Sequence, residues 1–262
     1  MLFDIGDAAS SVMSCALDLP GTGLLAIVGA GGKTSLMFRL AAELTAGGAR
    51  VACTTTTRIF PPAPDQARLI LEKDNARFLE ECRETANQSR PACLAWAAEG
   101  AKLRGLTTSF IHDLFKMRIF DWILVEADGA RRLPIKAPAD HEPVIPACST
   151  HVLAVAGLTA IGTPLDEQHV CRSERYAKLS GLALGDLVTP ASVARLCTHP
   201  KGMFKCAPSE AVRLLWLNQA DVPGALERGR EILRLLCEEG SLPHRAVLGA
   251  ANHHPCVQEV WS

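Results

Sequence analysis

Runs of consecutive apolar residues alternate along the chain with segments of helical periodicity. Buried strands are predicted from the apolar runs at 24–28, 51–54, 122–125, 151–157, 211–217 and 245–249. Between them, apolar positions recur every three or four residues, most clearly after residue 33 and again over 222–236. Strands that alternate with helices form a mainly parallel sheet covered on both sides. The pattern therefore predicts a three-layer α/β fold with helices on both faces of the sheet.

The region between residues 62 and 105 interrupts this alternation. Strands are predicted at 67–71 and 92–96 on either side of a helix over 75–86, and a further helix is predicted over 108–116. Because the insertion separates the second strand from the third, we expect it to form a small side sheet. The chain is thus predicted to be one domain over 1–262 with an inserted subregion at about 62–105.

Composition and charge exclude several classes of protein. The chain has 262 residues, 48% of them hydrophobic, and a net charge of −1, so it can bury a full core and lacks the basic excess of a general nucleic-acid-binding surface. No apolar run reaches the ~20 residues of a membrane span. Residues 1–20 predict a short amphipathic helix, and with Asp4 and Asp7 in place of basic residues they do not resemble a secretory signal. We expect a cytoplasmic protein that binds neither nucleic acid nor membrane.

Ten cysteines are scattered through the chain without a C-x-x-C pair. Most are expected to be small buried hydrophobes in a reducing cytoplasm. Two local groups, Cys197 with His199 and His253-His254 with Cys256, contain soft metal ligands, although a lone Cys-x-His is a weak signal of a metal site. The fold prediction does not depend on either group.

A glycine-rich loop follows the first predicted strand directly and leads into a helix. Successive glycines let backbone N–H groups turn inward around an anion, a helix N-terminus adds its dipole, and a lysine adds a point charge. The loop resembles a shortened P-loop, G-x-x-G-K-T, in which the hydroxyl after the lysine binds Mg²⁺. The alternative is an ordinary glycine-rich turn. The order of strand, glycines, Lys-Thr and helix favours a P-loop NTPase-like fold that binds GTP or ATP through Gly29, Ala30, Gly31, Gly32, Lys33, Thr34 and Ser35.

Two acidic residues end the strand predicted at 122–125. A carboxylate there can hold Mg²⁺ opposite the phosphates, directly or through water. Glu126 and Asp128 share one face of an extended chain because side chains alternate with period two. The alternative is a strand end that is acidic only because it is solvated. Together with the loop, the motif predicts a metal shell formed by Thr34, Glu126 and Asp128.

Four threonines, residues 54–57, follow the second strand. They are too polar to continue a buried strand, so we expect them at its carboxyl end, where α/β proteins bind ligands. A half-exposed strand end is the alternative. Thr56 is the threonine predicted to contact the nucleotide.

The segment 131–146 carries reactive side chains between prolines. Four prolines in the thirteen positions 134–146 exclude a regular helix or a central strand. A stiff loop leaving the nucleotide site is predicted. Lys136, His141 and Glu142 are expected to act on a second substrate or to sense the γ-phosphate, and Arg131 or Arg132 to neutralise charge in the transition state. The alternative is a surface loop with ordinary charges.

The sequence Asn218-Gln219-Ala220-Asp221 ends the strand predicted at 211–217. In GTP-binding proteins an Asn-Lys-x-Asp motif at a strand end recognises guanine. Here Gln219 stands in place of the lysine, which weakens the guanine assignment, and a helix N-cap is the alternative role. We predict base recognition by Asn218 and Asp221 and leave GTP and ATP open.

These motifs together resemble the YqeC family. The resemblance rests on the 29–34 loop, the 54–57 threonines, the 125–138 segment and, most specifically, His141-Glu142-Pro143-Val144-Ile145-Pro146. The family is described as accessory proteins of selenium-dependent hydroxylases, which implies a nucleoside-triphosphate-binding protein whose partners are a molybdenum hydroxylase or its cofactor-maturation proteins. The order of elements is also similar to metallochaperone GTPases of urease and hydrogenase maturation, and the short loop is similar to that of the Mur ligases.

Three functions remain open from the sequence. The first is a Mg²⁺-dependent nucleoside triphosphatase that drives maturation of a selenium-dependent molybdenum hydroxylase, in which the 54–57 and 131–142 segments move with γ-phosphate occupancy. The second is an ATP-dependent ligase or small-molecule kinase in which Lys136 and His141 line an acceptor pocket. The third is a nucleotide-sensing scaffold without turnover.

Overall fold

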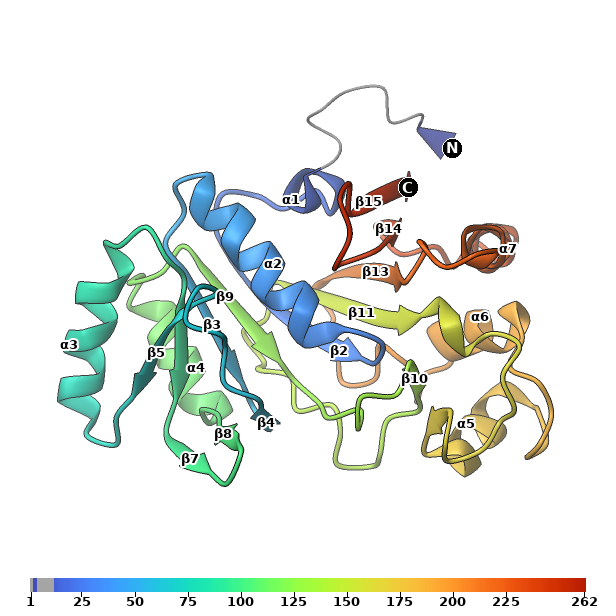
Figure 1. Ribbon diagram of the computed structural model, residues 1–262, viewed down its shortest axis with the longest axis horizontal. Helices are drawn as coiled ribbons and strands as arrows, with labels where there is room; N and C mark the ends of the chain where they lie inside the picture. Colours follow the sequence, from blue (N-terminus) through green and yellow to red (C-terminus); the bar gives the residue numbers. More distant parts are fainter. Residues whose placement is uncertain (1, 4–11) are drawn as a thin grey trace.

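The main feature of the computed structural model, which describes residues 2–3 and 12–262, is a ten-stranded sheet (Figure 1). From β14 to β5 the neighbouring strands run parallel, while β15 and β1 add an antiparallel edge. In spatial order the strands are β1 (Leu2–Phe3), β15 (Val257–Trp261), β14 (Arg245–Gly249), β13 (Val212–Asn218), β11 (His151–Gly157), β2 (Gly23–Gly29), β9 (Trp122–Glu126), β3 (Val51–Thr55), β6 (Ala92–Ala95) and β5 (Arg68–Leu71).

Helices cover both faces of this sheet, which confirms the predicted three-layer, mainly parallel α/β fold. Alternate residues of β2 face opposite ways: Leu25 and Ile27 pack with α1 (Met13–Ala16) and α2 (Lys33–Ala46), whereas Ala26 and Val28 pack with the opposite layer. That layer contains α3 (Asn75–Ala86), α4 (Thr108–Lys116), α6 (Pro190–Thr198) and α7 (Ala225–Glu238), with α5 (Ser173–Ser180) against α6. All seven residues of β2 are buried, as expected for a strand covered on both faces.

Local sequence explains where several of these helices begin. The Asp74 carboxylate accepts a hydrogen bond from the Arg77 amide at the start of α3, and the Thr107 hydroxyl accepts one from the Phe110 amide at the start of α4. Such side-chain caps satisfy amides that have no partner within the helix. The helices predicted at 75–86 and 108–116 are observed with those bounds.

The insertion at 62–105 is built differently from the prediction. β5 and β6 do not form a side sheet; they extend the main sheet beyond β3, with α3 as the crossover between them. β6 is fully buried, whereas β5 forms the edge of the sheet and buries only Ile70, which packs with Phe78 of α3. A separate three-stranded antiparallel sheet is formed instead by β4 (Arg58–Ile59), β8 (Lys102–Arg104) and β7 (Ala97–Glu99).

The threonine run also departs from the prediction. Thr54 and Thr55 continue β3 as fully buried residues. Their hydroxyls donate to the carbonyls of Leu94 at 2.8 Å and Glu126 at 2.7 Å, which satisfies the polar atoms inside the sheet. β3 therefore ends at Thr55, one residue later than predicted.

Part of the predicted N-terminal helix lies outside the described residues, at positions 1 and 4–11. Of the remainder, only α1 is helical, and Leu2–Phe3 pair with β15 instead. Besides β1 and the small sheet of β4, β7 and β8, the elements not predicted from the sequence are β15, α5, α6, the 3₁₀ helix Leu158–Ala160, and the two-residue pair β10 (Ile135–Lys136) and β12 (Val170–Cys171). Within the part of the chain that the structure describes, no helix combines the length and the apolarity needed to cross a bilayer.

Candidate functional site

The glycine loop lies at the carboxyl edge of the sheet and is tightly enclosed. Gly31 has a φ of +80°, and a Cβ there would meet the Gly157 nitrogen at 2.4 Å and the Pro134 oxygen at 2.5 Å. Gly32 has a φ of +115° and begins α2, and a Cβ there would meet the Asn218 side-chain nitrogen at 2.4 Å. Only glycine has both the backbone freedom and the size for these positions.

The backbone amides of the loop fall into two groups. Those of Gly29, Ala30 and Gly31 donate to the Asp128 carboxylate, the Val155 carbonyl and the Leu133 carbonyl, at 2.9–3.1 Å. The amides of residues 32–35, at the uncapped start of α2, donate to no acceptor within residues 2–3 and 12–262. The structure therefore limits the phosphate site to part of the predicted 29–35 loop. Only the first turn of α2 offers free N–H groups to an anion, because the amides of residues 29–31 already have acceptors.

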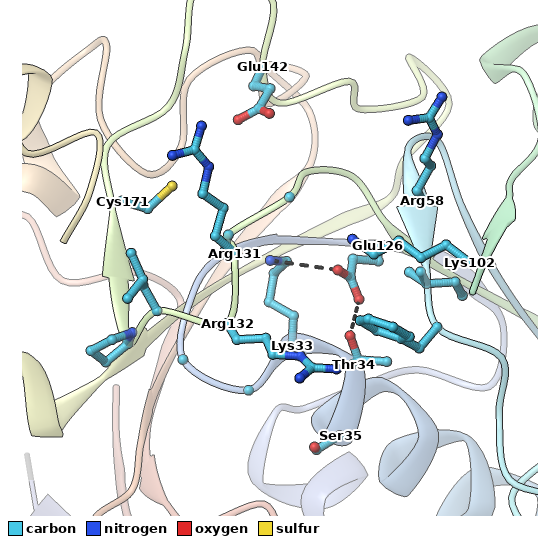
Figure 2. A pocket seen from close by; sticks show the side chains of 18 of the residues that line it. Lys33, Thr34, Ser35, Arg58, Lys102, Glu126, Arg131, Arg132, Glu142 and Cys171 are labelled. Carbon is cyan, nitrogen blue, oxygen red and sulfur yellow. Dashed lines mark hydrogen bonds and ion pairs between the residues drawn. The ribbon is translucent and has the colours of Figure 1, made fainter. Parts of the chain in front are cut away.

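Lys33 and Glu126 meet beside these free amides. The Lys33 amine is buried, donates to the Gly29 carbonyl at 2.8 Å, and lies 3.8 Å from one Glu126 carboxylate oxygen. The other Glu126 oxygen accepts a hydrogen bond from the Thr34 hydroxyl at 2.6 Å (Figure 2). A hydroxyl and a carboxylate brought together in this way are the hard oxygen donors that Mg²⁺ prefers.

Asp128, in contrast, is turned away from the cavity that these residues border. It is 1% exposed and lies between two lysine amines, that of Lys33 at 3.2 Å and that of Lys136 at 3.0 Å. Lys136 in turn contacts Glu142 at 2.6 Å, and Glu142 contacts Arg172 at 2.9 Å. We call this chain of ion pairs, Lys33-Asp128-Lys136-Glu142-Arg172, the buried ion network. The sequence predicts a metal-binding role for Asp128 and catalytic roles for Asp128 and Lys136; in the structure both side chains are paired with buried opposite charges.

Burial and neighbouring charge act in opposite directions on these groups. Burial raises the pKa of Glu126 above its ordinary value, and the nearby Lys33 and Thr34 only partly offset this. Burial also acts to lower the pKa of Lys33, but Asp128 and Glu126 outweigh it, so the pKa of Lys33 is raised. For Glu142, burial is outweighed by Lys136 and Arg172, and its pKa is lowered. Lys33 and Glu142 are therefore held charged, whereas Glu126 ionises less readily.

A cavity of about 950 Å³ opens over the first turn of α2. Its lining is dominated by cationic and glycine-rich segments from distant parts of the chain. The lining residues are Gly31, Gly32, Lys33, Thr34, Ser35, Arg58, Ile59, Phe60, Lys102, Glu126, Gly129, Ala130, Arg131, Arg132, Leu133, Pro134, Glu142, Thr159, Cys171, Arg172 and Gln219. The predicted residues Gly31–Ser35, Glu126 and Arg132 are thus brought together at one cavity.

Arg132 contacts the aromatic residue of this cavity. Its guanidinium lies 4.5 Å from the centre of the Phe60 ring, and the Lys102 amine lies 5.0 Å from the same centre. Cations attract aromatic faces electrostatically. Phe60 therefore connects the 131–146 segment to the small antiparallel sheet across the mouth of the cavity.

Backbone strain is concentrated around the cavity. Of the seven non-glycine residues with positive φ in the described residues, four line it: Arg131, Arg132, Arg172 and Gln219. Such conformations persist only where the surroundings enforce them, and they cluster at functional sites. The concentration of strained residues indicates that this cavity is the functional site.

His141 and Thr56 are among the predicted residues that lie outside the cavity lining. His141 does not line it, and its side chain is 80% exposed. His141 lies in a turn closed by the hydrogen bond from the Glu142 amide to the Ala139 carbonyl, and it is the Glu142 side chain that contacts Lys136. Thr56 is also outside the lining, because its hydroxyl donates to the Val144 carbonyl at 2.8 Å.

The Asn218 amide is used to hold the loop in place. Its nitrogen donates to the Gly31 carbonyl at 2.7 Å, and its oxygen accepts from the Ala251 amide at 2.9 Å and from the Trp216 indole at 3.2 Å. Asp221 lies outside the cavity lining, with a carboxylate oxygen 3.3 Å from the His253 ring. The structure thus does not bring the two residues predicted for base recognition to the cavity wall, while Gln219 between them does line it and accepts a hydrogen bond from Thr159 at 2.6 Å.

Several cavity residues were missed by the sequence analysis. Arg58, Phe60 and Lys102 come from the small antiparallel sheet, and Cys171 and Arg172 come from the end of β12. β12 is only two residues long and is positioned by parallel pairing with β10, so no periodicity could have indicated it. Six of the ten cysteines are buried, and no group of three or more His, Cys, Asp or Glu side chains suited to a metal ion exists in residues 2–3 and 12–262.

Comparison with known families identifies the chain. The family model described as "YqeC protein" matches residues 25–174. The chain belongs to the YqeC family. An Escherichia coli (strain K12) relative named "Uncharacterized protein YqeC" is 37% identical over 197 residues, which are 75% of this chain and 75% of the relative. The family match covers the loop, the acidic motif and the 131–146 segment.

Among solved structures, the YqeC chain is similar to hydrogenase maturation factor HypB from Archaeoglobus fulgidus, with 14% identity over 93% of this chain and 87% of that chain and a TM-score of 0.41. HypB from Helicobacter pylori in complex with nickel gives 11% identity over 90% and 81% and a TM-score of 0.41. FtsY from Mycoplasma mycoides gives 15% identity over 93% and 66% and a TM-score of 0.43. The strand, glycine loop and helix described above give this YqeC chain the P-loop NTPase class of fold.

Proposed function

We propose that this YqeC protein binds a nucleoside triphosphate with Mg²⁺ and hydrolyses it as an accessory factor in the maturation of a selenium-dependent molybdenum hydroxylase. The observation that carries the nucleotide part is a single junction at the start of α2. There, four free amides, the Lys33 amine and the Thr34–Glu126 pair border one cavity. Family membership supports the accessory role.

The donor set at this junction fits Mg²⁺. The Thr34 hydroxyl and the Glu126 carboxylate would hold the ion, which typically keeps several waters and takes one or two protein oxygens together with phosphate oxygens. When bound, Mg²⁺ would neutralise charge that develops on the phosphates. The raised pKa of Glu126 also makes this carboxylate the one suited to orient or accept a proton from an attacking water.

Lys33 and Arg132 supply positive charge from two sides of the cavity. Lys33 is pre-positioned at the loop by the Gly29 carbonyl and by Asp128, so little ordering is needed when a phosphate arrives. Arg132 lines the cavity and is steadied by Phe60, and a guanidinium held near the phosphates stabilises transition-state charge. Hydrolysis would then rest on position and electrostatics.

A binding titration tests the nucleotide part directly. GTP and ATP are titrated with and without Mg²⁺ into the wild-type protein, into Lys33→Ala, and into a control, Lys116→Ala, in which an exposed lysine at the end of α4 is removed. A charge-assisted hydrogen bond contributes about 1.5–3 kcal/mol, so Lys33→Ala is expected to weaken binding by about 10- to 100-fold. Undiminished affinity in Lys33→Ala would refute the proposal.

Turnover separates this function from the ligase or kinase and from the scaffold. A maturation factor is expected to release phosphate slowly alone and faster with its client protein. A ligase or kinase would release phosphate or transfer it only when a small acceptor is present, and a scaffold would bind tightly without turnover under either condition. Phosphate release is measured alone, with a selenium-dependent hydroxylase, and with candidate acceptors.

A further inference from the structure

The cavity lining is rich in cationic side chains. Six of them line it, against the two carboxylates Glu126 and Glu142. Three of the six also contact carboxylates outside the lining: Lys33 lies 3.2 Å from Asp128, Arg58 lies 2.8 Å from Glu99, and Arg131 lies 4.0 Å from Glu167. Where these cations lie therefore decides which anions the cavity can bind.

These cations form two groups. Lys102 and Arg132 both lie over the Phe60 ring, and Arg58 and Lys102 come from the same small sheet. Arg131 lies on the other side of Lys33, next to Cys171, with Glu142 beyond it (Figure 2). Arg172 follows Cys171 directly in the chain and lines the same cavity, so we group it with Arg131. The cations thus include two arginines apart from those around Phe60.

Both arginines of this pair are held in shape by the fold. Arg131 has a φ of 52° and Arg172 a φ of 65°. The Arg172 guanidinium donates to Glu142 at 2.9 Å and to the Ala137 carbonyl at 3.4 Å, and its side chain is 26% exposed. Arg131 has only a distant carboxylate, that of Glu167 at 4.0 Å, and its side chain is 78% exposed. Arg172 is a fixed donor at the wall, and Arg131 is free to close over a ligand.

The buried ion network connects Arg172 to the loop. Arg172 and Lys33 are its two ends, and Glu142, whose pKa is lowered, keeps its charge between them. Because every carboxylate in the network already has a cation partner, the remaining N–H groups of the two guanidiniums are available to an external anion. Two guanidinium forks suit the geometry of a phosphate better than that of a single carboxylate, since they offer several parallel donors to several oxygens.

We propose that Arg131 and Arg172 form a second anion subsite, which binds the dianionic phosphate group of a second substrate while the triphosphate occupies the start of α2. Only one part of this proposal rests on the proposed nucleotide function, namely that the subsite holds the acceptor of the reaction. The binding of a tetrahedral dianion by two guanidiniums follows from the residues that line the cavity. The ligand is either free orthophosphate or a phosphomonoester of a small organic molecule.

Calorimetric titration of the full chain tests the subsite. The protein is first saturated with Mg²⁺ and a non-hydrolysable triphosphate analogue, so that the nucleotide site is filled and cannot bind the probe. It is then titrated with orthophosphate or phenyl phosphate. The subsite predicts binding of one equivalent, weakened at least tenfold in the double variant R131A/R172A and several-fold in R131A alone. The control R175A removes an exposed arginine of α5 that lies outside the cavity lining and is expected to bind like the wild type.

The outcomes separate the two sources and the two proposals. Equal affinity for the two probes identifies free orthophosphate, and tighter binding of phenyl phosphate identifies a phosphomonoester. R131A is expected to fold normally, because the Arg131 side chain is exposed and its removal leaves the buried ion network complete. It therefore tests the subsite even if the double variant does not fold. Absence of binding in the wild type, wild-type binding by R131A and the double variant, or weakening by R175A equal to that of R131A would overturn the subsite.

A second measurement makes failure of the nucleotide proposal distinguishable. Without nucleotide, Lys33→Ala is titrated with the same probes. If the nucleotide proposal is wrong but the subsite is real, the GTP and ATP titrations show no effect of Lys33→Ala, while Lys33→Ala binds the probe like the wild type and R131A binds it several-fold more weakly. If the probe instead occupies the start of α2, Lys33→Ala loses it and R131A keeps it, and the subsite is refuted.

Discussion

The two walls of the cavity are built by different means. The wall at the start of α2 consists of residues contiguous in sequence, Gly31 to Ser35, with Glu126 from the adjacent strand. The opposite wall, with Arg131, Arg172 and Glu142, comes from irregular segments with positive φ angles and is held by the buried ion network. The first wall is a local motif, and the second exists only once distant segments have assembled. The comparison shows that the phosphate wall depends on local sequence, whereas the arginine wall depends on long-range contacts.

Asp128→Asn, which removes the central negative charge of the buried ion network with little change in side-chain shape, is expected to have the largest effect on stability. The substitution leaves Lys33 and Lys136 without their shared carboxylate, and breaking a buried ion pair typically costs about 3–5 kcal/mol. The free energy of unfolding in urea measures it. Asp140→Asn, whose carboxylate is exposed and pairs with Arg175, is the control and is expected to show no measurable change. Equal effects of the two substitutions would mean that the two walls are not connected through Asp128.

A methyl group in the loop tests the first wall by shape alone. Gly31→Ala places a Cβ against backbone atoms at 2.4–2.5 Å, so strain and overpacking together are expected to cost about 2–4 kcal/mol and to abolish nucleotide binding. Gly48→Ala is the matched control: its φ of +91° is similarly unfavourable for alanine, but nothing lies within 4 Å of the added atom. It is expected to cost about 1–2 kcal/mol with unchanged affinity. Unfolding and nucleotide titration of both variants separate close packing from backbone strain.

Acidification is expected to disable the first wall before the second. Burial raises the pKa of Glu126 above 4.5, so its ionised form, which binds the metal, is lost at a higher pH than for an ordinary glutamate. The pKa of Glu142 is lowered below 4.5, because Lys136 and Arg172 outweigh burial, so its contribution to stability persists until the pH falls through that lower value. For Glu126 the sign is opposite: its burial favours the fold at low pH, and this contribution is lost as the pH rises through its raised pKa.

Titrations of Mg²⁺-dependent nucleotide affinity from neutral pH downward measure this order. Affinity is expected to fall up to tenfold per pH unit below the pKa of Glu126 while the protein stays folded, as followed by circular dichroism. Glu126→Gln is expected to abolish the pH dependence along with the Mg²⁺ requirement. Loss of affinity only together with unfolding would contradict a metal role for Glu126.

The smallest effect is expected at Asp221. It lies outside the cavity lining next to His253, so Asp221→Asn is expected to change GTP and ATP affinity by less than about threefold, as for most partly exposed ion pairs. Parallel titrations with the two nucleotides measure it. A selective loss of GTP binding would instead support the guanine-recognition role predicted from the Asn-x-x-Asp spacing.

The first wall was predictable from the sequence because its chemistry is local. The order of strand, glycines, Lys33 and helix indicated the loop, and the period of two correctly placed Glu126 and Asp128 on one side, where both approach Lys33. The same reasoning could not tell that Asp128 is already matched by two lysines. That depends on Lys136, whose position is fixed by pairing between two-residue strands 35 residues apart in sequence, at Ile135 and Val170.

Long-range contacts also explain the other differences. Asn218 has the spacing of a base-recognition residue, but its amide is used by the Gly31 carbonyl, a contact 187 positions away. His141 was predicted at the site instead of Arg172, since a histidine between prolines is conspicuous in a sequence, whereas an arginine with a left-handed backbone before a helix is not.

The contact between Asn218 and Gly31 has a consequence for biosynthesis. The glycine motif is translated 187 residues ahead of Asn218, whose side chain braces it, and the Ala251 amide that orients this side chain is added later still. A nascent chain on the ribosome will therefore carry the motif without the brace until these residues have been made. Competence to take up nucleotide is expected to arise only after β13 and the segment after β14 have joined the fold.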